Sequence, residues 1–106
     1  MKLYKVYHNS AFLDHSPFDW GSKIMPDQDK LELVAVVNAD TLEDVYQCTN
    51  HINKPWNEHP NLTAIGMRFR STSCGDVIED TNGHKHVVAA NGFIEIKQSE
   101  VIGIKQ

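Results

Sequence analysis

The sequence predicts an α+β domain with a small, mostly antiparallel sheet of about five to six strands and one main helix packed on it. Two observations carry this prediction. Short segments rich in β-branched residues recur along the chain, and a single amphipathic segment lies between them. The resulting order is strand, long loop, strand, helix and β-meander, which is typical of α+β architecture. Because 106 residues suit one hydrophobic core, we expect a single domain over residues 1–106.

The first strand is predicted at Lys2–Tyr7, where apolar residues occur on both faces and lysines at the rim. A long irregular loop is expected over about residues 8–30, because this segment contains Pro17, Gly21, Pro26 and four aspartates. A loop of this length is either functional or contains a short helix. Its large apolar residues predict that it packs onto the domain: Phe12, Leu13, Phe18 and Trp20.

The most apolar stretch, Leu31–Val37, predicts a strand buried on both faces and central in the sheet. A helix is expected directly after it, with Asp40 as its N-cap and Glu43 completing a capping box. Pro55 and Pro60 are incompatible with its continuation. Spacings of three and four residues place one apolar stripe along the helix: Leu42, Val45, Tyr46 and Thr49.

The rest of the chain is β in character. A strand is predicted at Thr63–Phe69, followed by a polar turn at Arg70–Asp76. Asn82-Gly83 is a strong hairpin signal because both residues tolerate positive φ, and Asn91-Gly92 repeats it. The strands expected around these turns are Val77–Ile78, His86–Ala89 and Phe93–Ile96, with Val101–Ile104 as an extension of the sheet or a frayed end.

Composition argues against several classes of function. Ten basic and fourteen acidic side chains give a formal net charge of -4, which argues against a general phosphate-binding surface. No apolar run approaches the ~20 residues of a membrane span, so we expect no membrane association. The N-terminal residues are typical of a strand and not of a signal region, and two cysteines form no disulfide framework. A cytoplasmic location is therefore expected.

Histidines and cysteines suggest two reactive sites, each with a structural alternative. His84 and His86 share a strand face, and Cys48 and His51 share the helix end, so together they could supply four zinc ligands. The spacing matches no recognised zinc pattern, and we predict neither a metal nor a cofactor. Cys74 lies in a polar turn that could activate a thiol, or it turns inward as a small apolar side chain. We favour the inward side chain and expect no enzymatic activity.

A short basic segment suggests contact with nucleic acid. Arg68 and Arg70 share a strand face, and the hydroxyl groups of Ser71, Thr72 and Ser73 could donate hydrogen bonds to phosphates. The alternative is that the arginines pair with local acids and the hydroxyl residues shape the turn.

Three segments follow one another in a distinctive order: Leu42–Ile52 with Pro55-Trp56, then Arg70–Ile78, then Val87–Phe93. Together they resemble small uncharacterised proteins of bacteriophages and plasmids that are similar to the YodL-like domain group. In that group a helix ending near Thr-Asn-His-Ile precedes an Arg-Ser-x-Ser-x-Gly-Asp-Val turn, a hairpin and a Gly-Phe or Gly-Trp strand. The resemblance covers residues 31–97, and Cys74 stands where the group has an apolar residue. It implies an origin in a mobile genetic element.

These observations predict a non-enzymatic protein that binds a host macromolecule in the host cytoplasm. A host protein is the expected partner, and inhibition of a host defence or regulatory protein is the expected outcome. The contact surface is expected in the acidic loop from Asp14 to Asp29 together with the loop that carries Trp56 and His59. Trp56 could instead cap the core. The alternative function is a nucleic-acid-binding module using Arg68, Arg70 and Ser71–Ser73, and the oligomeric state stays open.

Overall fold

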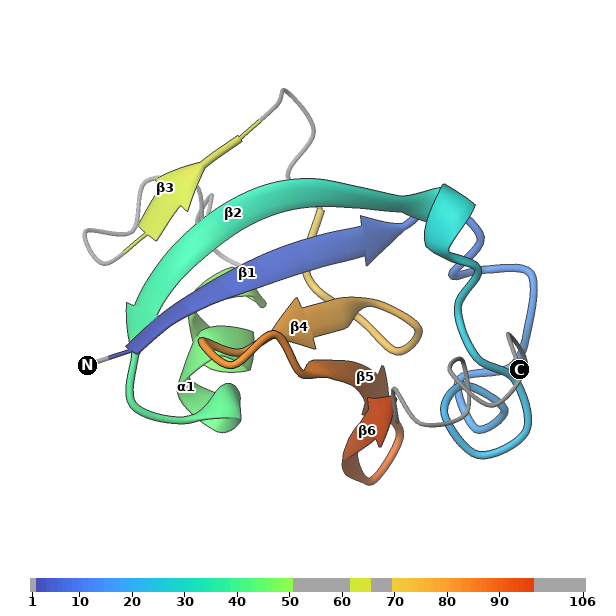
Figure 1. Cartoon of the computed structure of the whole chain (residues 1–106). Helices are drawn as coiled ribbons and strands as arrows, with labels where there is room; N and C mark the ends of the chain where they lie inside the picture. The colour runs from blue at the N-terminus through green and yellow to red at the C-terminus, as the bar shows by residue number, and fades with distance from the viewer. Residues whose placement is uncertain (1, 51–61, 66–69, 97–106) are drawn as a thin grey trace, which may run out of the picture.

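In the part of the chain that the structure describes, six strands form one antiparallel sheet in the order β3-β2-β1-β4-β5-β6, with one α-helix on it (Figure 1). The computed structural model describes residues 2–50, 62–65 and 70–96. This arrangement confirms the predicted α+β class. The elements are β1 (Lys2–Asn9), the 3-10 helix η1 (Gln28–Lys30), β2 (Leu31–Ala39), α1 (Leu42–Thr49), β3 (Leu62–Ala64), β4 (Val77–Glu79), β5 (Lys85–Ala89) and β6 (Gly92–Ile96).

β1 and β2 form the longest strand pair of the sheet. Along β1 the side chains of Tyr4 and Val6 are buried and those of Leu3 and Lys5 are exposed, as the alternating sequence requires. The strand continues to Asn9, two residues beyond the predicted end at Tyr7. The loop between the strands spans residues 10–27 and is called the β1–β2 loop below. Of residues 8–30, only 28–30 form a helical turn.

A β-bulge interrupts the β1–β2 pair. Val6 is opposite Ala35 whereas Tyr7 is opposite Leu33, so Val34 has no partner residue in β1. Such a bulge reverses the alternation of side chains beyond it. As a result Glu32, which is opposite His8, projects from the same face of the sheet as His8.

The prediction that β2 is central is wrong. β2 is the second strand from one edge, because the short β3 pairs with its outer side and β1 separates it from β4. β2 is nevertheless well buried, with Val34, Ala35 and Val37 in the core. The strand predicted at Thr63–Phe69 corresponds to β3, which ends at Ala64. Residues 66–69 of the prediction lie outside the described residues.

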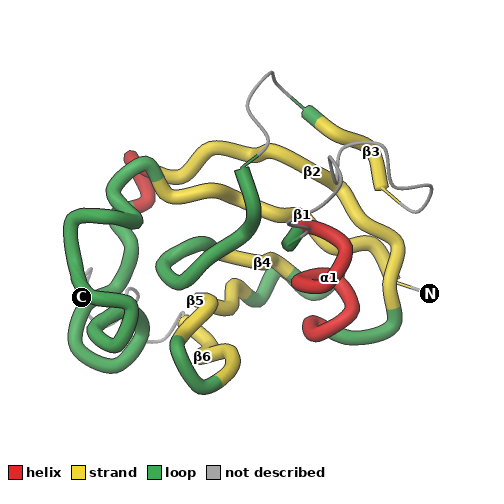
Figure 2. The backbone as a smooth tube through the Cα atoms, turned by 180° about the vertical axis from the view of Figure 1, so that it is seen from behind, coloured by secondary structure: helices red, strands yellow, loops and turns green. Residues whose placement is uncertain are grey.

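The helix α1 lies against one face of the sheet, as Figures 1 and 2 show from opposite sides. Its N-cap is Thr41, whose hydroxyl oxygen accepts from the Asp44 N–H at 3.1 Å, so the prediction of an Asp40 cap is wrong. Val45 and Thr49 are buried on the predicted stripe. Leu42 and Tyr46 pack against the same core.

Apolar residues are buried on both faces of the sheet. On the helix side, Tyr4, Val6, Val45 and Ile78 belong to the larger cluster. On the other side a smaller cluster consists of Trp20, Val77 and Val87. Cross-strand pairing places Tyr7, Val77 and Val87 on that second face. The β1–β2 loop supplies Trp20 and lies at the end of the sheet opposite the N-terminus (Figure 1).

The hairpins predicted from the Asn-Gly pairs are confirmed. β4 and β5 are joined by a turn that contains Gly83 at φ 83°, and β5 and β6 are joined by a turn that ends at Gly92. The predicted segment Val101–Ile104 lies outside the described residues. In the described part of the chain, no helix has the length and apolar character needed to cross a membrane.

Candidate functional site

An ion pair between Arg70 and Asp76 organises the turn that precedes β4. Both terminal nitrogens of the guanidinium donate to the carboxylate, at 2.6 and 2.7 Å, and Asp76 is fully buried. The same nitrogens donate to the backbone carbonyl oxygens of Ser71 and Asn9. The guanidinium carbon lies 3.7 Å from the centroid of the Phe12 ring. Arg70 therefore connects the turn, β1 and the β1–β2 loop through a neutralised, charge-assisted pair.

Asn9 at the end of β1 completes this network. Its backbone N–H donates to the Asp76 carboxylate at 2.8 Å, and its side-chain amide donates to the Gly75 carbonyl oxygen at 3.0 Å. Its side-chain oxygen accepts from the Ala11 N–H at 2.9 Å. The Ser73 N–H also donates to Asp76, at 2.7 Å. Buried polar groups are stable when they are hydrogen-bonded in this way, so the network orders both segments around it.

The basic segment predicted to contact nucleic acid therefore has a structural role where it is described. The terminal nitrogens of Arg70 are occupied by oxygens of the protein itself. Thr72 is fully buried, and its hydroxyl lies 3.1 Å from the His8 Nε2 atom. The Ser73 hydroxyl donates to the Ser71 carbonyl oxygen. These contacts match the alternative in which the arginine pairs with a local acid and the hydroxyl residues shape the turn.

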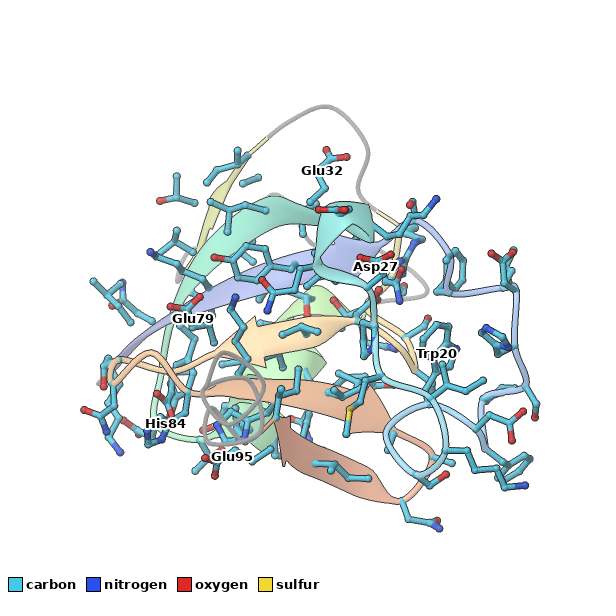
Figure 3. All side chains as sticks on the ribbon, turned by 45° about the vertical axis from the view of Figure 1, so that its right-hand side comes forward. Trp20, Asp27, Glu32, Glu79, His84 and Glu95 are labelled. Carbon is cyan, nitrogen blue, oxygen red and sulfur yellow. The ribbon has the colours of Figure 1, made fainter. Side chains whose placement is uncertain are left out.

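A cavity of about 310 Å³ opens where β1, β2 and this turn meet. Glu32 is exposed at the cavity, and among the described residues it has neither a hydrogen-bond nor an ion-pair partner. Figure 3 shows its side chain extending from the first part of β2, away from β4, β5 and β6. The described residues that line the cavity are His8, Asn9, Ser10, Phe12, Glu32, Val34 and Arg70.

His8 is neutral at pH 7. Burial lowers the pKa of its imidazole to about 4, the Arg70 charge contributes in the same direction, and the Asp76 charge opposes them. The Arg70 charge is compensated by Asp76. Glu32 is therefore the uncompensated charged group among the described residues that line the cavity. The local field favours a positively charged ligand.

The β1–β2 loop is held to the sheet by several contacts. The buried Trp20 packs on Val77 and Val87, and its indole N–H donates to the Phe12 carbonyl oxygen at 3.1 Å. A Cβ atom placed on Gly75 would lie 2.8 Å from the Trp20 ring, so the turn and the loop are in close contact. Figure 3 shows Trp20 between the loop and the β4–β5 part of the sheet. The loop is thus preorganised.

The outer side of the same loop exposes large apolar side chains. Leu13 is 80% exposed, Phe18 72% and Met25 47%, so three of the five exposed large apolar residues found in the described chain belong to one loop. Phe18 also borders a recess of about 140 Å³ together with Trp20 and Ile94. Apolar groups that a folded loop leaves in water are typical of a binding surface.

Acidic side chains surround these apolar residues in the chain. The segment 10–30 contains two lysines, of which Lys23 forms an ion pair with Asp19. The segment carries four aspartates: Asp14, Asp19, Asp27 and Asp29. The loop with its following turn therefore combines exposed apolar groups with an excess of negative charge.

The predicted histidine pair lies at the β4–β5 turn. His86 Nε2 is 3.1 Å from an Asp80 carboxylate oxygen, and His84 Nδ1 lies 3.9 Å from Asp80 and 3.7 Å from Glu95. Figure 3 shows His84 and Glu95 close together. Asp80 also accepts hydrogen bonds from two backbone N–H groups. Burial alone would raise the pKa of Asp80, but these two bonds and the one with His86 lower it below its ordinary value. In the residues that the structure describes, no group of histidine, cysteine or acidic side chains has the arrangement of a metal site.

Neither cysteine has the surroundings of an activated nucleophile. Cys74 packs against the cluster that contains Trp20, and burial raises the pKa of its thiol. Cys48 packs against the helix-side core, and burial raises its pKa as well. A nucleophilic thiol requires a lowered pKa. The inward, half-buried position of Cys74 agrees with the structural alternative given for it.

Sequence reasoning located only part of this region. Trp56, His59 and Arg68 lie outside the described residues, so their predicted roles stay predictions. His8 and Glu32 were missed, because the bulge at Val34 that brings them to one face leaves no recognisable signal in the sequence.

Comparison with known proteins gives no independent assignment. No protein-family model, no curated protein and no solved structure matches the chain. The resemblance to the YodL-like group therefore stays a prediction from its motifs.

Proposed function

We propose that this chain is a non-enzymatic binding protein that attaches to a positively charged surface of a partner protein through the β1–β2 loop. The observation that carries the proposal is the exposure of Leu13 and Phe18 on a loop whose own position is secured by Trp20. A preorganised loop loses little conformational entropy on binding, so its exposed apolar groups contribute efficiently to affinity.

The charge of the loop supports the choice of partner. Asp27 and Asp29 are exposed, and Asp14 is exposed beside Leu13. Acidic groups around apolar anchors favour a basic partner and accelerate its association. The resemblance to phage and plasmid proteins makes a host protein the proposed partner, with inhibition of a defence or regulatory protein as the proposed outcome.

The nucleic-acid alternative receives less support. Three described members of its site make contacts inside the fold: Arg70 pairs with Asp76, Thr72 is buried, and the Ser73 hydroxyl donates to the Ser71 carbonyl oxygen. A titration with short RNA and DNA at low salt is expected to show no binding. Binding that weakens steeply with salt would favour the alternative instead.

The proposal is tested by affinity capture from host cells with three proteins: the wild type, the Leu13→Ser/Phe18→Ser variant and a Leu3→Ser control. Leu3 is 55% exposed but lies near the start of β1, at the other end of the strand from the loop. We expect the wild type and the control to retain the same basic protein, the double variant to lose it, and high salt to weaken capture. Equal capture by all three proteins would contradict the proposal.

A further inference from the structure

The cavity at His8 and Glu32 is a second recognition feature beside the β1–β2 loop. Its wall includes Ser10 and Phe12, the first part of that loop, so a partner seated on the loop lies next to its opening. Its volume of about 310 Å³ can receive the end of one long side chain. The charges and hydrogen-bonding groups of its lining decide what kind of side chain that is.

The lining excludes an anion as the preferred ligand. Arg70 has the positive charge that an anion needs, but its terminal nitrogens already donate to Asp76 and to two backbone carbonyl oxygens. His8 is uncharged at neutral pH because it is buried. Among the described residues that line the cavity, an anion would therefore meet no available cation, and Glu32 would repel it.

The same lining suits a cation on an apolar stem. The Glu32 carboxylate stands at the opening without a partner among the described residues and can accept charge-assisted hydrogen bonds. Val34 lines the cavity from the bulge and offers an apolar contact to a methylene chain. A lysine or arginine side chain has this combination of apolar stem and cationic end.

We infer that the cavity between His8, Glu32 and Arg70 binds the cationic end of a lysine or arginine side chain of the partner. The choice of a partner side chain rests on the proposed function. The preference of the cavity for an alkyl cation does not, because it follows from the lining residues alone. The two can therefore be tested separately.

The cavity is tested first without a partner, by NMR titration of the full chain with butylguanidinium and butylammonium. Butyrate and butanol serve as probes of similar size with negative and no charge. We expect saturable shifts at Ser10 and the His8 ring with the two cations at millimolar concentrations, and about tenfold weaker binding of butyrate. Absence of saturable shifts with the cations, or equal binding of butyrate, would overturn the inference.

Glu32→Gln removes the charge with little change of shape, and Glu43→Gln is the matched control because Glu43 is also exposed but lies in α1. We expect Glu32→Gln to weaken cation binding about tenfold and Glu43→Gln to leave it within twofold. Equal affinities in the two variants would overturn the role of Glu32. The wild-type comparison of cation and anion stays decisive even if a variant fails to fold.

The origin of the cation is tested by competition. Butylguanidinium at saturating concentration is expected to reduce capture of the basic partner by the wild type, and butyrate at equal concentration to leave it unchanged. Cation binding without competition would overturn the assignment of the ligand to the partner. If the proposed function is wrong but the cavity inference is right, the result is different. The Leu13→Ser/Phe18→Ser variant would then capture the partner normally, and the cavity would still bind butylguanidinium.

Discussion

Asp76 connects the end of β1 with the turn before β4 through one buried carboxylate. It accepts from the Asn9 and Ser73 backbone N–H groups and from both terminal nitrogens of Arg70. Removing one member of a buried ion pair leaves the other without its compensating charge, which is costly. The residues at this point of the fold are therefore under structural constraint, while Glu32 beside them has no comparable set of contacts.

Two glycines with positive φ provide a matched test of the contact between turn and loop. A Cβ atom on Gly75 would lie 2.8 Å from the Trp20 ring, whereas Gly83 has open space around it at a similar φ. We expect Gly83→Ala to lower the free energy of unfolding by about 1 kcal/mol from backbone strain alone. Gly75→Ala is expected to cost about 1–3 kcal/mol more because of overpacking.

Urea denaturation of both alanine variants measures this difference. Equal losses of stability in the two variants would show that Trp20 does not occupy the position described for it.

His8 predicts a pH dependence of stability with a definite sign. Its folded pKa of about 4 lies below its ordinary value of 6.5, so the unfolded chain binds the proton more readily. Stability from this group is fully present above pH 6.5 and is lost as the pH falls toward 4. The predicted loss is about 3 kcal/mol over that window.

Denaturation of the wild type and of His8→Gln at several pH values isolates this contribution. The glutamine variant does not titrate there, so its stability should fall less steeply between pH 6.5 and pH 4. Parallel curves for the two proteins would contradict a buried, neutral His8.

Helices and strands are predicted well from the sequence where the spacing of apolar residues and the turn residues agree. The hairpin around Asn82-Gly83 and the stripe of α1 follow from such local signals. The position of β2 does not, because sheet order depends on which distant strand pairs with each side of β1. The cavity could not be predicted from local sequence patterns either, because it depends on the bulge at Val34 and on Arg70, which is distant in the sequence.

The N-cap of α1 lies one residue after the predicted position. Asp40 and Thr41 are both good capping residues, but Thr41 has the extended backbone and accepts from the Asp44 N–H. We expect Thr41→Ala to destabilise the protein by about 1 kcal/mol, because the N–H loses its partner.

Thr41→Ser retains a capping hydroxyl and is expected to restore most of that stability in urea denaturation. No difference between the alanine and serine variants would indicate that another residue caps the helix.

For the whole molecule, the two ends of the β1–β2 pair have different properties. The end near the start of β1 carries α1 on one face of the sheet, and the other end carries the exposed, acidic β1–β2 loop beside the cavity (Figure 1). The net charge of -4 thus includes a concentrated acidic surface, while the Arg70 charge is neutralised by the buried Asp76. This asymmetry is the basis for assigning partner binding to the loop end.

Photo-crosslinking in host cells shows which end of the molecule contacts the partner. A photoreactive phenylalanine analogue is placed at Phe18 in one protein and at Leu3 in another, since both side chains are exposed and neither is fully packed. We expect a discrete adduct with a basic protein from position 18, weakened when Asp27 and Asp29 are changed to asparagine, and none from position 3. Adducts from position 3 alone, or the same adduct from both positions, would contradict it.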